Sequence, residues 1–408
     1  MSSRTNIKSL QISTVYGGGA GRACIRLHEA LLEHPAVTSR VLIGQNCPKD
    51  ALPGVVPLYK NELSSFLHRR WTKLIAGMAL RGLPPTEETF MIPRTGHSVH
   101  RHPIIDEVDV VNLHWTTRLL DHRSFFKAIQ KPLVWTLHDM NPWSGGYPYD
   151  RKFPFTAYDQ QIKRNLTLQV EALQNIDNLT IVCPSQWLLE ASKASKLFGR
   201  YRHELIPYSL NTEVFIPQSV TDLRREFGLA ADKKVLLFVA TQLGHVRKGL
   251  HHLIKALRLL ADRGDAKNLE LAIVGNGRPA DLPETLAVRE LGRISNEADM
   301  AKVYAAADLF VIPSEQDNLP NTVLESLSTG TPVVGFRIGG IPDMVSDPSL
   351  GCLAENISPE ELALAIGEAL TTKFKRQHIR ETALARYMPK VQAEAYYQLY
   401  LDILPHRG

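Results

Sequence analysis

The chain has 408 residues, which is more than one ordinary hydrophobic core accommodates, so two domains are expected. Its content of 44% apolar and 22% charged residues is the profile of a soluble globular protein. The formal net charge of +5 suits anionic small molecules or an anionic membrane surface, and nucleic acid is not expected as a partner.

The remaining composition indicates a cytoplasmic protein. None of the four cysteines, Cys24, Cys47, Cys183 and Cys352, pairs with another at metal-ligand or redox spacing. The amino terminus has no apolar signal core, and no run approaches the roughly 18 apolar residues that span a bilayer.

The first half of the chain alternates short apolar runs with helical patterns. We predict strands at 9–15, 40–44, 108–113, 133–137 and 179–183, and helices at 21–33 and from Gln186. Such alternation is typical of βαβ units and a parallel sheet.

The second half repeats this rhythm. We predict strands at 235–240, 269–274, 309–312 and 332–336, and helices at 250–261, 298–307, 322–328, 360–370, 373–387 and 390–404. The segment 205–217 has two prolines and little periodicity, so it is the predicted linker. The predicted architecture is α/β, with two doubly wound domains in tandem. In such folds ligands bind at the carboxyl ends of the strands, and here we expect them in a cleft between the domains.

Glycines follow the first predicted strand in the segment 15–22, VYGGGAGR. They allow a close approach of backbone to a ligand, and the helix start that follows offers free N–H groups to an anion. Gly18 and Gly19 are therefore candidate donor-binding residues. The alternative is a tight turn without a ligand, and the spacing differs from the dinucleotide pattern G-x-G-x-x-G.

His138 ends another apolar strand, in the sequence Thr136-Leu137-His138-Asp139. It is a candidate for hydrogen bonding or acid–base chemistry, because functional side chains collect at the carboxyl ends of strands. A structural histidine is the alternative.

Arg247 and Lys248 lie between a predicted strand and a predicted helix. Two adjacent cations there suit a diphosphate, which needs charge neutralisation as it leaves. A solvated basic pair is the alternative.

Two carboxylates frame the next strand–helix connection. Asp317 precedes the helix and Glu325 lies inside it, eight positions later. Pro320 fits the first helical turn, and the N–H groups that follow it suit an anion. We expect Glu325 to accept hydrogen bonds from ribose hydroxyls and Asp317 from sugar hydroxyls. The alternatives are a loop residue at Asp317 and a solvated position at Glu325.

With these motifs in view, the sequence resembles the bacterial glycosyltransferases of family four, which are retaining enzymes of the GT-B fold. Four blocks carry the resemblance, and the last is the most specific: GGGAGR at 17–22, VNLHW at 111–115 with VWTLHDMNPWSGG at 134–146, PSQWL at 184–188, and the long block at 303–345. The sequence departs from the family at two positions, with Asp317 in place of the first glutamate of a Glu-x7-Glu element and Leu243 in place of an arginine.

The resemblance implies a division of labour between domains. It implies an acceptor-side domain at 1–206, a donor-binding domain at 207–387, and a helix at 388–408 that packs back toward the first domain. Catalytic roles are expected for His138, Lys248 and Asp317. Donor contacts are expected from Gly18, Gly19, Arg247, Lys248, Asp317, Asn318, Leu319, Pro320, Asn321, Thr322 and Glu325.

The predicted reaction is sugar transfer from a UDP- or GDP-linked donor to a saccharide or lipid-linked acceptor, in surface or exopolysaccharide biosynthesis. The chain has no Asp-x-Asp motif, so no metal and no cofactor are expected. Arg247 is the hypothetical substitute for the arginine absent at Leu243. The alternatives are a sugar-nucleotide epimerase, a phosphorylase, and an inactive binding module.

A basic amphipathic helix is predicted at 65–81, SFLHRRWTKLIAGMALR. Phe66, Leu67, Trp71, Leu74, Ile75 and Met78 recur at helical spacing, among several cations. Such a helix either lies in an anionic membrane interface or packs against its own domain. The first interpretation predicts a peripheral protein at the inner face of the cell membrane.

Overall fold

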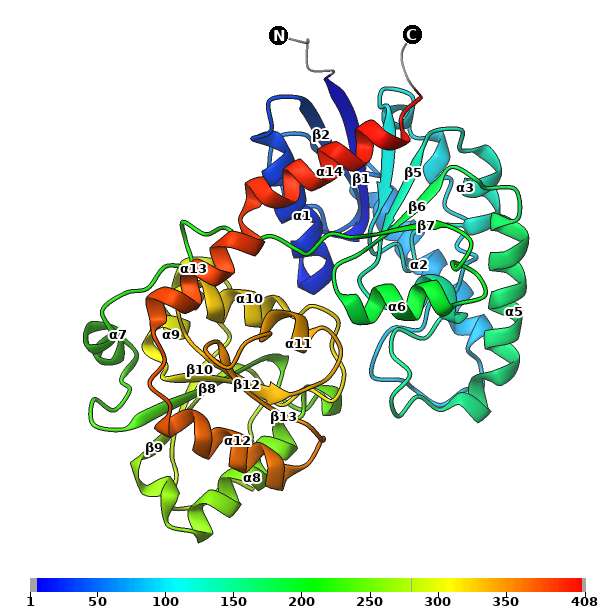
Figure 1. Ribbon diagram of the computed structural model, residues 1–408. Coiled ribbons are helices and arrows are strands. Elements are labelled where there is room, and N and C mark those ends of the chain that lie inside the picture. Colours follow the sequence, from blue (N-terminus) through cyan, green and yellow to red (C-terminus); the bar gives the residue numbers. More distant parts are fainter. Residues whose placement is uncertain (1–5, 280, 406–408) are drawn as a thin grey trace. The chain divides into compact units, whose positions relative to one another are not determined.

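The computed structural model describes residues 6–279 and 281–405. It divides into two compact units, which we call unit 1 and unit 2 (Figure 1). Unit 1 runs to Ser209 and takes up the chain again from Pro389, and unit 2 is Leu210–Met388. None of the helices in the described part of the chain has the length and apolarity that crossing a membrane requires.

Unit 1 is built on a seven-stranded sheet in the order β3-β2-β1-β4-β5-β6-β7, with parallel pairing throughout. Its strands are β1 (Ile7–Val15), β2 (Val37–Gln45), β3 (Val55–Pro57), β4 (Val110–Leu113), β5 (Leu133–Thr136), β6 (Leu179–Cys183) and β7 (Arg202–Leu205). Its helices are α1 (Gly18–Leu32), α2 (Glu62–Ala79), α3 (His122–Ala128), α4 (Asn141–Ser144), α5 (Phe155–Leu173), α6 (Gln186–Ala194) and α14 (Pro389–Ile403), with 3-10 turns at Val99–Arg101 and Pro103–Ile105.

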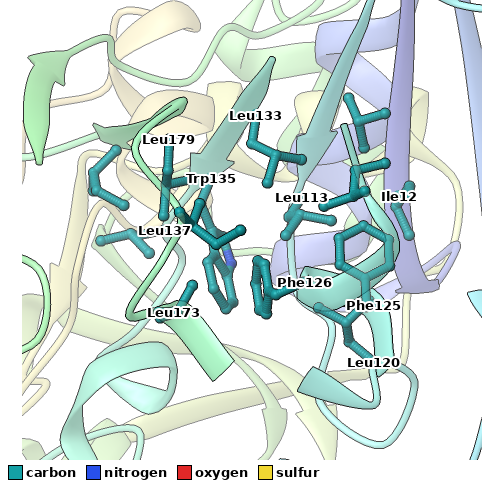
Figure 2. Packing of buried hydrophobic residues seen from close by; sticks show 14 of the residues in the cluster. Ile12, Leu113, Leu120, Phe125, Phe126, Leu133, Trp135, Leu137, Leu173 and Leu179 are labelled. Carbon is teal, nitrogen blue, oxygen red and sulfur yellow. The ribbon is translucent and has the colours of Figure 1, made fainter. Parts of the chain in front are cut away.

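Apolar layers cover both faces of this sheet. On one face Trp135 and Leu113 pack with Phe125 and Phe126 of α3 (Figure 2). On the other, α14 lies beside α1, and its Tyr396 and Tyr400 are buried with Val110 and Val134 (Figure 1). The carboxyl-terminal helix is therefore part of the core of unit 1.

Unit 2 has a six-stranded parallel sheet in the order β10-β9-β8-β11-β12-β13. Its strands are β8 (Lys234–Gln242), β9 (Leu269–Asn276), β10 (Ala287–Gly292), β11 (Leu309–Ile312), β12 (Val333–Phe336) and β13 (Gly351–Ala354). Its helices are α7 (Val220–Phe227), α8 (Leu250–Asp262), α9 (Glu297–Ala306), α10 (Asn321–Ser328), α11 (Ile341–Met344), α12 (Pro359–Thr371) and α13 (Arg376–Tyr387), with 3-10 turns at Val246–Lys248 and Asp265–Asn268.

Both sheets are doubly wound, which confirms the predicted α/β class. The strand order reverses between β1 and β4 in unit 1 and between β8 and β11 in unit 2. In open sheets of this kind, ligands bind at the carboxyl ends of the strands where the order reverses. A ligand site in unit 2 is therefore expected at the residues that follow β8 and β11.

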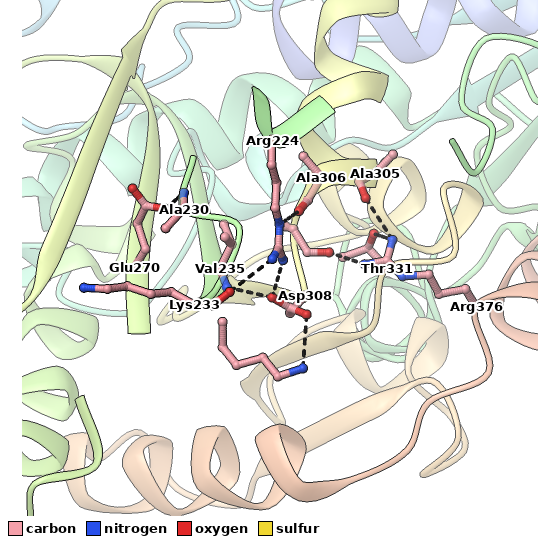
Figure 3. Close-up of polar contacts among 12 residues, drawn as sticks. Arg224, Ala230, Lys233, Val235, Glu270, Ala305, Ala306, Asp308, Thr331 and Arg376 are labelled. Atoms are coloured by element: carbon pink, nitrogen blue, oxygen red, sulfur yellow. Dashed lines mark hydrogen bonds and ion pairs between the residues drawn. The ribbon is translucent and has the colours of Figure 1, made fainter. Parts of the chain in front are cut away.

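Two arginines, the buried Arg224 and the half-buried Arg376, fix the start of β11. Arg224 of α7 donates to the carbonyl oxygens of Lys233 and Ala306 and pairs with Asp308, while Arg376 donates to the carbonyls of Ala305 and Ala307 (Figure 3). Burial lowers the pKa of Arg376 below its ordinary value. These bonds hold the α9–β11 connection, and with it the strand that carries the site at its other end.

Candidate functional site

The loops that follow β8 and β11 lie against each other. The backbone N–H of Glu315 donates to the carbonyl of Arg247 over 2.8 Å. Gly249 has a φ of +72°, and a Cβ there would come within 1.7 Å of the carbonyl oxygen of Pro313. Only glycine permits this approach, which joins the start of α8 to the end of β11.

An ion pair links the two loops. The Lys248 Nζ lies 2.6 Å from Asp317 Oδ2, and the Arg247 guanidinium lies 3.5 Å from the same oxygen. Arg247 also donates to the carbonyl of Gln316 over 2.7 Å, and the Ser314 hydroxyl to Asp317 over 3.3 Å. The structure thus brings the predicted Arg247–Lys248 pair together with Asp317, which the sequence singled out in a separate motif.

Asp317 is a buried carboxylate, with 7% of its surface exposed. Burial raises its pKa, but Lys248 and Arg247 outweigh that effect and hold the pKa below its ordinary value. The side chain is therefore ionised at neutral pH, and its charge is matched by the two cations.

A third loop, after β12, fixes the backbone of Asp317. Gly339 has a φ of +53°, and a Cβ there would lie 1.8 Å from the Asp317 carbonyl oxygen. The N–H of Gly340 donates to that carbonyl over 3.2 Å. These glycines were not among the predicted site residues, although a Gly-Gly pair after an apolar strand is a sequence signal for such a turn.

The start of α10 offers backbone donors beside this cluster. Pro320 occupies the position before the helix, and no side chain caps the first turn. Asn321 and Thr322 are half-buried, whereas Asn318, Leu319 and Pro320 are buried. The first-turn N–H groups of such a helix favour an anion.

Glu325 lies in the second turn of α10 and is 3% exposed. The interpretation of this residue as a solvated helix position is therefore wrong, since the side chain is buried among Val323, Leu324 and Leu327. Its position so close to the start of α10 suits a role toward a polar ligand.

The side chain at position 243 brings no charge to the site. Leu243 is 5% exposed and packs in the core of unit 2 with Phe238 and Leu250. The guanidinium near Asp317 is that of Arg247, four residues further on.

The cluster has a neighbour that the sequence analysis missed. The Nε2 atoms of His251 and His252 lie 3.3 and 3.0 Å from the same oxygen, Oε1 of the buried Glu315. These three residues are a group whose ligand atoms are close enough together to hold a metal ion. However, the two histidines lie in the first turn of α8, where the helix dipole opposes a cation.

The other candidates, Gly18, Gly19 and His138, belong to unit 1. Gly18 and Gly19 are exposed at the start of α1, and no side chain caps that helix. His138 is buried just beyond β5.

A buried hydrogen-bonded chain engages both ring nitrogens of His138. Its Nδ1 lies 2.7 Å from the Tyr208 hydroxyl and its Nε2 lies 3.1 Å from His114 Nδ1, while His114 Nε2 lies 3.1 Å from Gln11 Oε1. The Gln11 oxygen can only accept, so His114 carries its proton on Nε2 and His138 does the same. The Tyr208 hydroxyl then donates to His138.

Burial lowers the pKa of His138 to about 3, so the ring is neutral at physiological pH. The adjacent Asp139 is also buried, and burial raises its pKa to about 7, although it accepts hydrogen bonds from Trp115 and the N–H of Asn141. A catalytic role for His138 stays a prediction, and proton transfer through its ring would require one of the bonds to Tyr208 or His114 to break.

Comparison with known proteins gives the site a context. Residues 233–372 match the family model described as glycosyl transferases group 1. A segment of 198 residues is 30% identical to the D-inositol 3-phosphate glycosyltransferase of Mycobacteroides abscessus, covering 45% of this chain and 43% of that relative. The match thus spans about half the length of the curated relatives.

Solved structures match over nearly the whole chain. The sucrose-phosphate synthase of Thermosynechococcus elongatus aligns with a TM-score of 0.69 and 18% identity, over 97% of this chain and 99% of that one. The HepE protein of Anabaena, solved in complex with UDP and glucose, aligns with a TM-score of 0.64 and 17% identity, over 96% and 99% of the two chains. Likeness at this identity shows the fold, and it confirms the predicted GT-B class.

Proposed function

We propose that this chain, whose residues 233–372 belong to the glycosyl transferases group 1 family, is an enzyme that transfers a sugar from a nucleotide-sugar donor with retention of configuration. The observation that carries the proposal is the pairing of Lys248 with the buried Asp317, where the strand order of unit 2 reverses. Within one cluster, Lys248 supplies a cation that binds a diphosphate, and Asp317 supplies a carboxylate that accepts hydrogen bonds from sugar hydroxyls.

Lys248 is the group that meets the donor's diphosphate. In the structure the ammonium donates to Asp317 Oδ2 over 2.6 Å. A diphosphate carries more negative charge than one carboxylate, so it competes with Asp317 for this ammonium and for the Arg247 guanidinium, which lies 3.5 Å from Asp317 Oδ2. In the transition state the leaving diphosphate gains charge, and the cation stabilises it there most strongly.

The start of α10 supports the same arrangement. The uncapped first turn at Asn321 and Thr322 offers N–H donors to phosphate oxygens, and Glu325 accepts hydrogen bonds from ribose hydroxyls. Asp317 accepts hydrogen bonds from hydroxyls of the transferred sugar. Because Lys248, Arg247 and the helix start neutralise the diphosphate, the reaction needs no metal.

The donor is a UDP- or GDP-linked sugar, and the acceptor is a saccharide or a lipid-linked saccharide in surface polysaccharide synthesis. HepE of Anabaena has been solved in complex with UDP-glucose, which makes this compound the first donor to test.

The test is a panel of UDP- and GDP-sugars, screened by thermal shift and followed by product analysis. A donor present at a hundredfold excess over its dissociation constant stabilises the protein by about 2.7 kcal/mol. We expect at least one donor to raise the melting temperature, and NMR of the product to show the donor's anomeric configuration. A panel in which no nucleotide sugar shifts the melting temperature, or a product of inverted configuration, would contradict the proposal.

A further inference from the structure

The helix α2 presents its apolar side chains outward. Leu63, Leu67, Trp71, Leu74 and Met78 recur at spacings of four, four, three and four, so they share one face of the helix. Each of them is between 51% and 63% exposed. A surface helix of a globular protein normally turns such a stripe toward its core.

The inward face of α2 is polar around Thr72, and only Ala79, at the end of the helix, packs against the apolar cluster of Phe90 and Tyr158. Thr72 is the one buried residue of the helix, and its hydroxyl lies 2.7 Å from His97 Nε2. The other nitrogen of His97 lies 2.6 Å from the Tyr59 hydroxyl, and the His68 ring stacks on both Tyr59 and His97. Hydrogen bonds and ring stacking therefore hold α2 in an orientation that leaves the apolar stripe outside.

Cations border the stripe. Arg70 and Lys73 are exposed on the helix and Arg81 follows its end, whereas the half-buried Arg69, on the other side of the helix, donates to Asn46 over 3.0 Å. Phe66 is 45% exposed, and the Arg70 guanidinium lies over its ring at 5.6 Å. Against these four cations, the helix carries a single carboxylate, Glu62.

We propose that this face of α2, formed by Leu63, Phe66, Leu67, Arg70, Trp71, Lys73, Leu74 and Met78, docks unit 1 on an anionic lipid surface. The apolar stripe enters the boundary between headgroups and acyl chains, and the long cationic side chains reach to the headgroups. The helix is 18 residues long, so it lies along the surface over about 27 Å.

The positive charge of this face favours an anionic lipid surface over a second copy of the chain as its partner. A symmetric dimer would place the same patch on both sides, so the cations of both copies would be brought into one interface. Like charges repel in such an interface, whereas an anionic bilayer matches the cations and the apolar stripe together. The inference goes beyond the sugar-transfer proposal and does not depend on it.

The test is co-sedimentation of the full chain with two kinds of vesicle, pure phosphatidylcholine and phosphatidylcholine mixed with phosphatidylglycerol, at low and at high salt. Two double variants separate the contributions: Arg70→Glu with Lys73→Glu for charge, and Leu67→Gln with Leu74→Gln for the apolar stripe. The matched control is Arg225→Glu with Lys196→Glu, which changes net charge equally at exposed cations outside α2.

We expect the parent and the control to pellet with the mixed vesicles at low salt, and each α2 variant to partition at least tenfold less. Salt should weaken the parent's binding, and Trp71 fluorescence should shift to the blue on binding. All substitutions are at exposed positions, and melting curves verify that the variants fold.

Three outcomes would overturn the proposal. The first is a parent that stays in the supernatant at low salt, and the second is a parent that binds both kinds of vesicle equally. The third is a parent that is dimeric in light scattering and becomes monomeric when Leu67 and Leu74 are replaced, which would assign the face to a second copy.

Discussion

Lys248 and Asp317 are 69 residues apart in the chain, yet their side chains meet at 2.6 Å. The parallel pairing of β8 with β11 brings them together, since each follows one of these two strands. Asp317 is buried and Lys248 is partly exposed, so the lysine is the member of the pair that a ligand from solvent reaches first.

We expect Lys248→Met to lower donor turnover by about a hundredfold or more, because the cation acts on charge that develops in the transition state. Donor affinity should fall by less, since the ground-state diphosphate retains Arg247 and the start of α10. Steady-state kinetics, with donor hydrolysis as the readout where no acceptor is supplied, check this.

Lys255→Met is the control, because Lys255 is exposed on the same helix, α8. A Lys248→Met variant with normal turnover would remove this lysine from the mechanism.

Replacing Glu325 with glutamine should weaken UDP or GDP binding by about 1–3 kcal/mol, through loss of charge-assisted hydrogen bonds to ribose hydroxyls. Calorimetry measures the affinity, and a melting curve is required because Glu325 is buried. The exposed Glu368 on α12 provides a matched Glu368→Gln control. Unchanged nucleotide affinity in a folded Glu325→Gln variant would show that this carboxylate does not contact the ribose.

His138 should stay neutral from pH 5 to pH 8, because burial holds its pKa near 3. In the unfolded chain a histidine titrates at about 6.5. The unfolded state therefore binds more protons below that value, and this residue's contribution to stability is complete above about pH 6.5 and is lost as the pH falls toward 3.

NMR of the His138 ring, assigned by comparison with His138→Gln, tests this prediction. A ring that titrates between pH 5 and 8 would contradict the buried chain of hydrogen bonds, and would restore His138 as a general acid or base.

Arg224→Met should destabilise unit 2 by about 3 kcal/mol, because it leaves the carboxylate of Asp308 and two backbone carbonyls without this donor. Urea unfolding followed by a probe in unit 2 measures the change. Arg225→Met, at an exposed neighbour that pairs with Asp222 over 3.7 Å, should change stability by less than about 0.5 kcal/mol. Equal effects of the two substitutions would show that the buried contacts of Arg224 contribute little.

Sugar transfer should persist in excess chelator, because Lys248, Arg247 and the N–H groups at the start of α10 neutralise the diphosphate. The group formed by His251, His252 and Glu315 makes this a sharp test, since within the described residues it is a place where a metal could bind. Loss of activity in chelator, restored by magnesium or manganese, would contradict the prediction. The same loss in His252→Gln would then locate the metal at this group.

Interior strands were predictable from sequence and edge strands were not. β4, β5, β11 and β12 are buried on both faces and read as continuous apolar runs. The edge strands β7 (RHEL) and β10 (AVRELG) are partly exposed and polar, so they gave no such signal.

The helix α5 escaped prediction for a different reason. Its buried face includes Asn165 and Gln169, whose amide groups donate to the carbonyl oxygens of Met91, Gly145 and Pro142. These amides interrupt the apolar pattern of the helix, whose buried face otherwise includes Tyr158 and Leu173. For α2, the sequence predicted the amphipathic pattern but not which side of the helix faces solvent. That orientation depends on the contact of Thr72 with the distant His97.

The sequence identified the members of the candidate site but not their pairing. Asp317, Lys248 and Glu325 stood out because each lies where a strand gives way to a helix. The ion pair depends on which strands are neighbours, and the convergence of His251 and His252 on Glu315 depends on the contact between two loops. Neither follows from local pattern, because both join residues more than sixty positions apart.

The central claim is that the carboxyl ends of β8 and β11 bind the diphosphate of a nucleotide sugar. A crystal structure of the full chain with saturating UDP or GDP tests it most directly. We predict that the diphosphate oxygens lie within hydrogen-bonding distance of Lys248 and the first-turn N–H groups of α10, with the ribose hydroxyls on Glu325. A nucleotide bound elsewhere, with the Lys248–Asp317 pair intact and no contact to α10, would contradict the account.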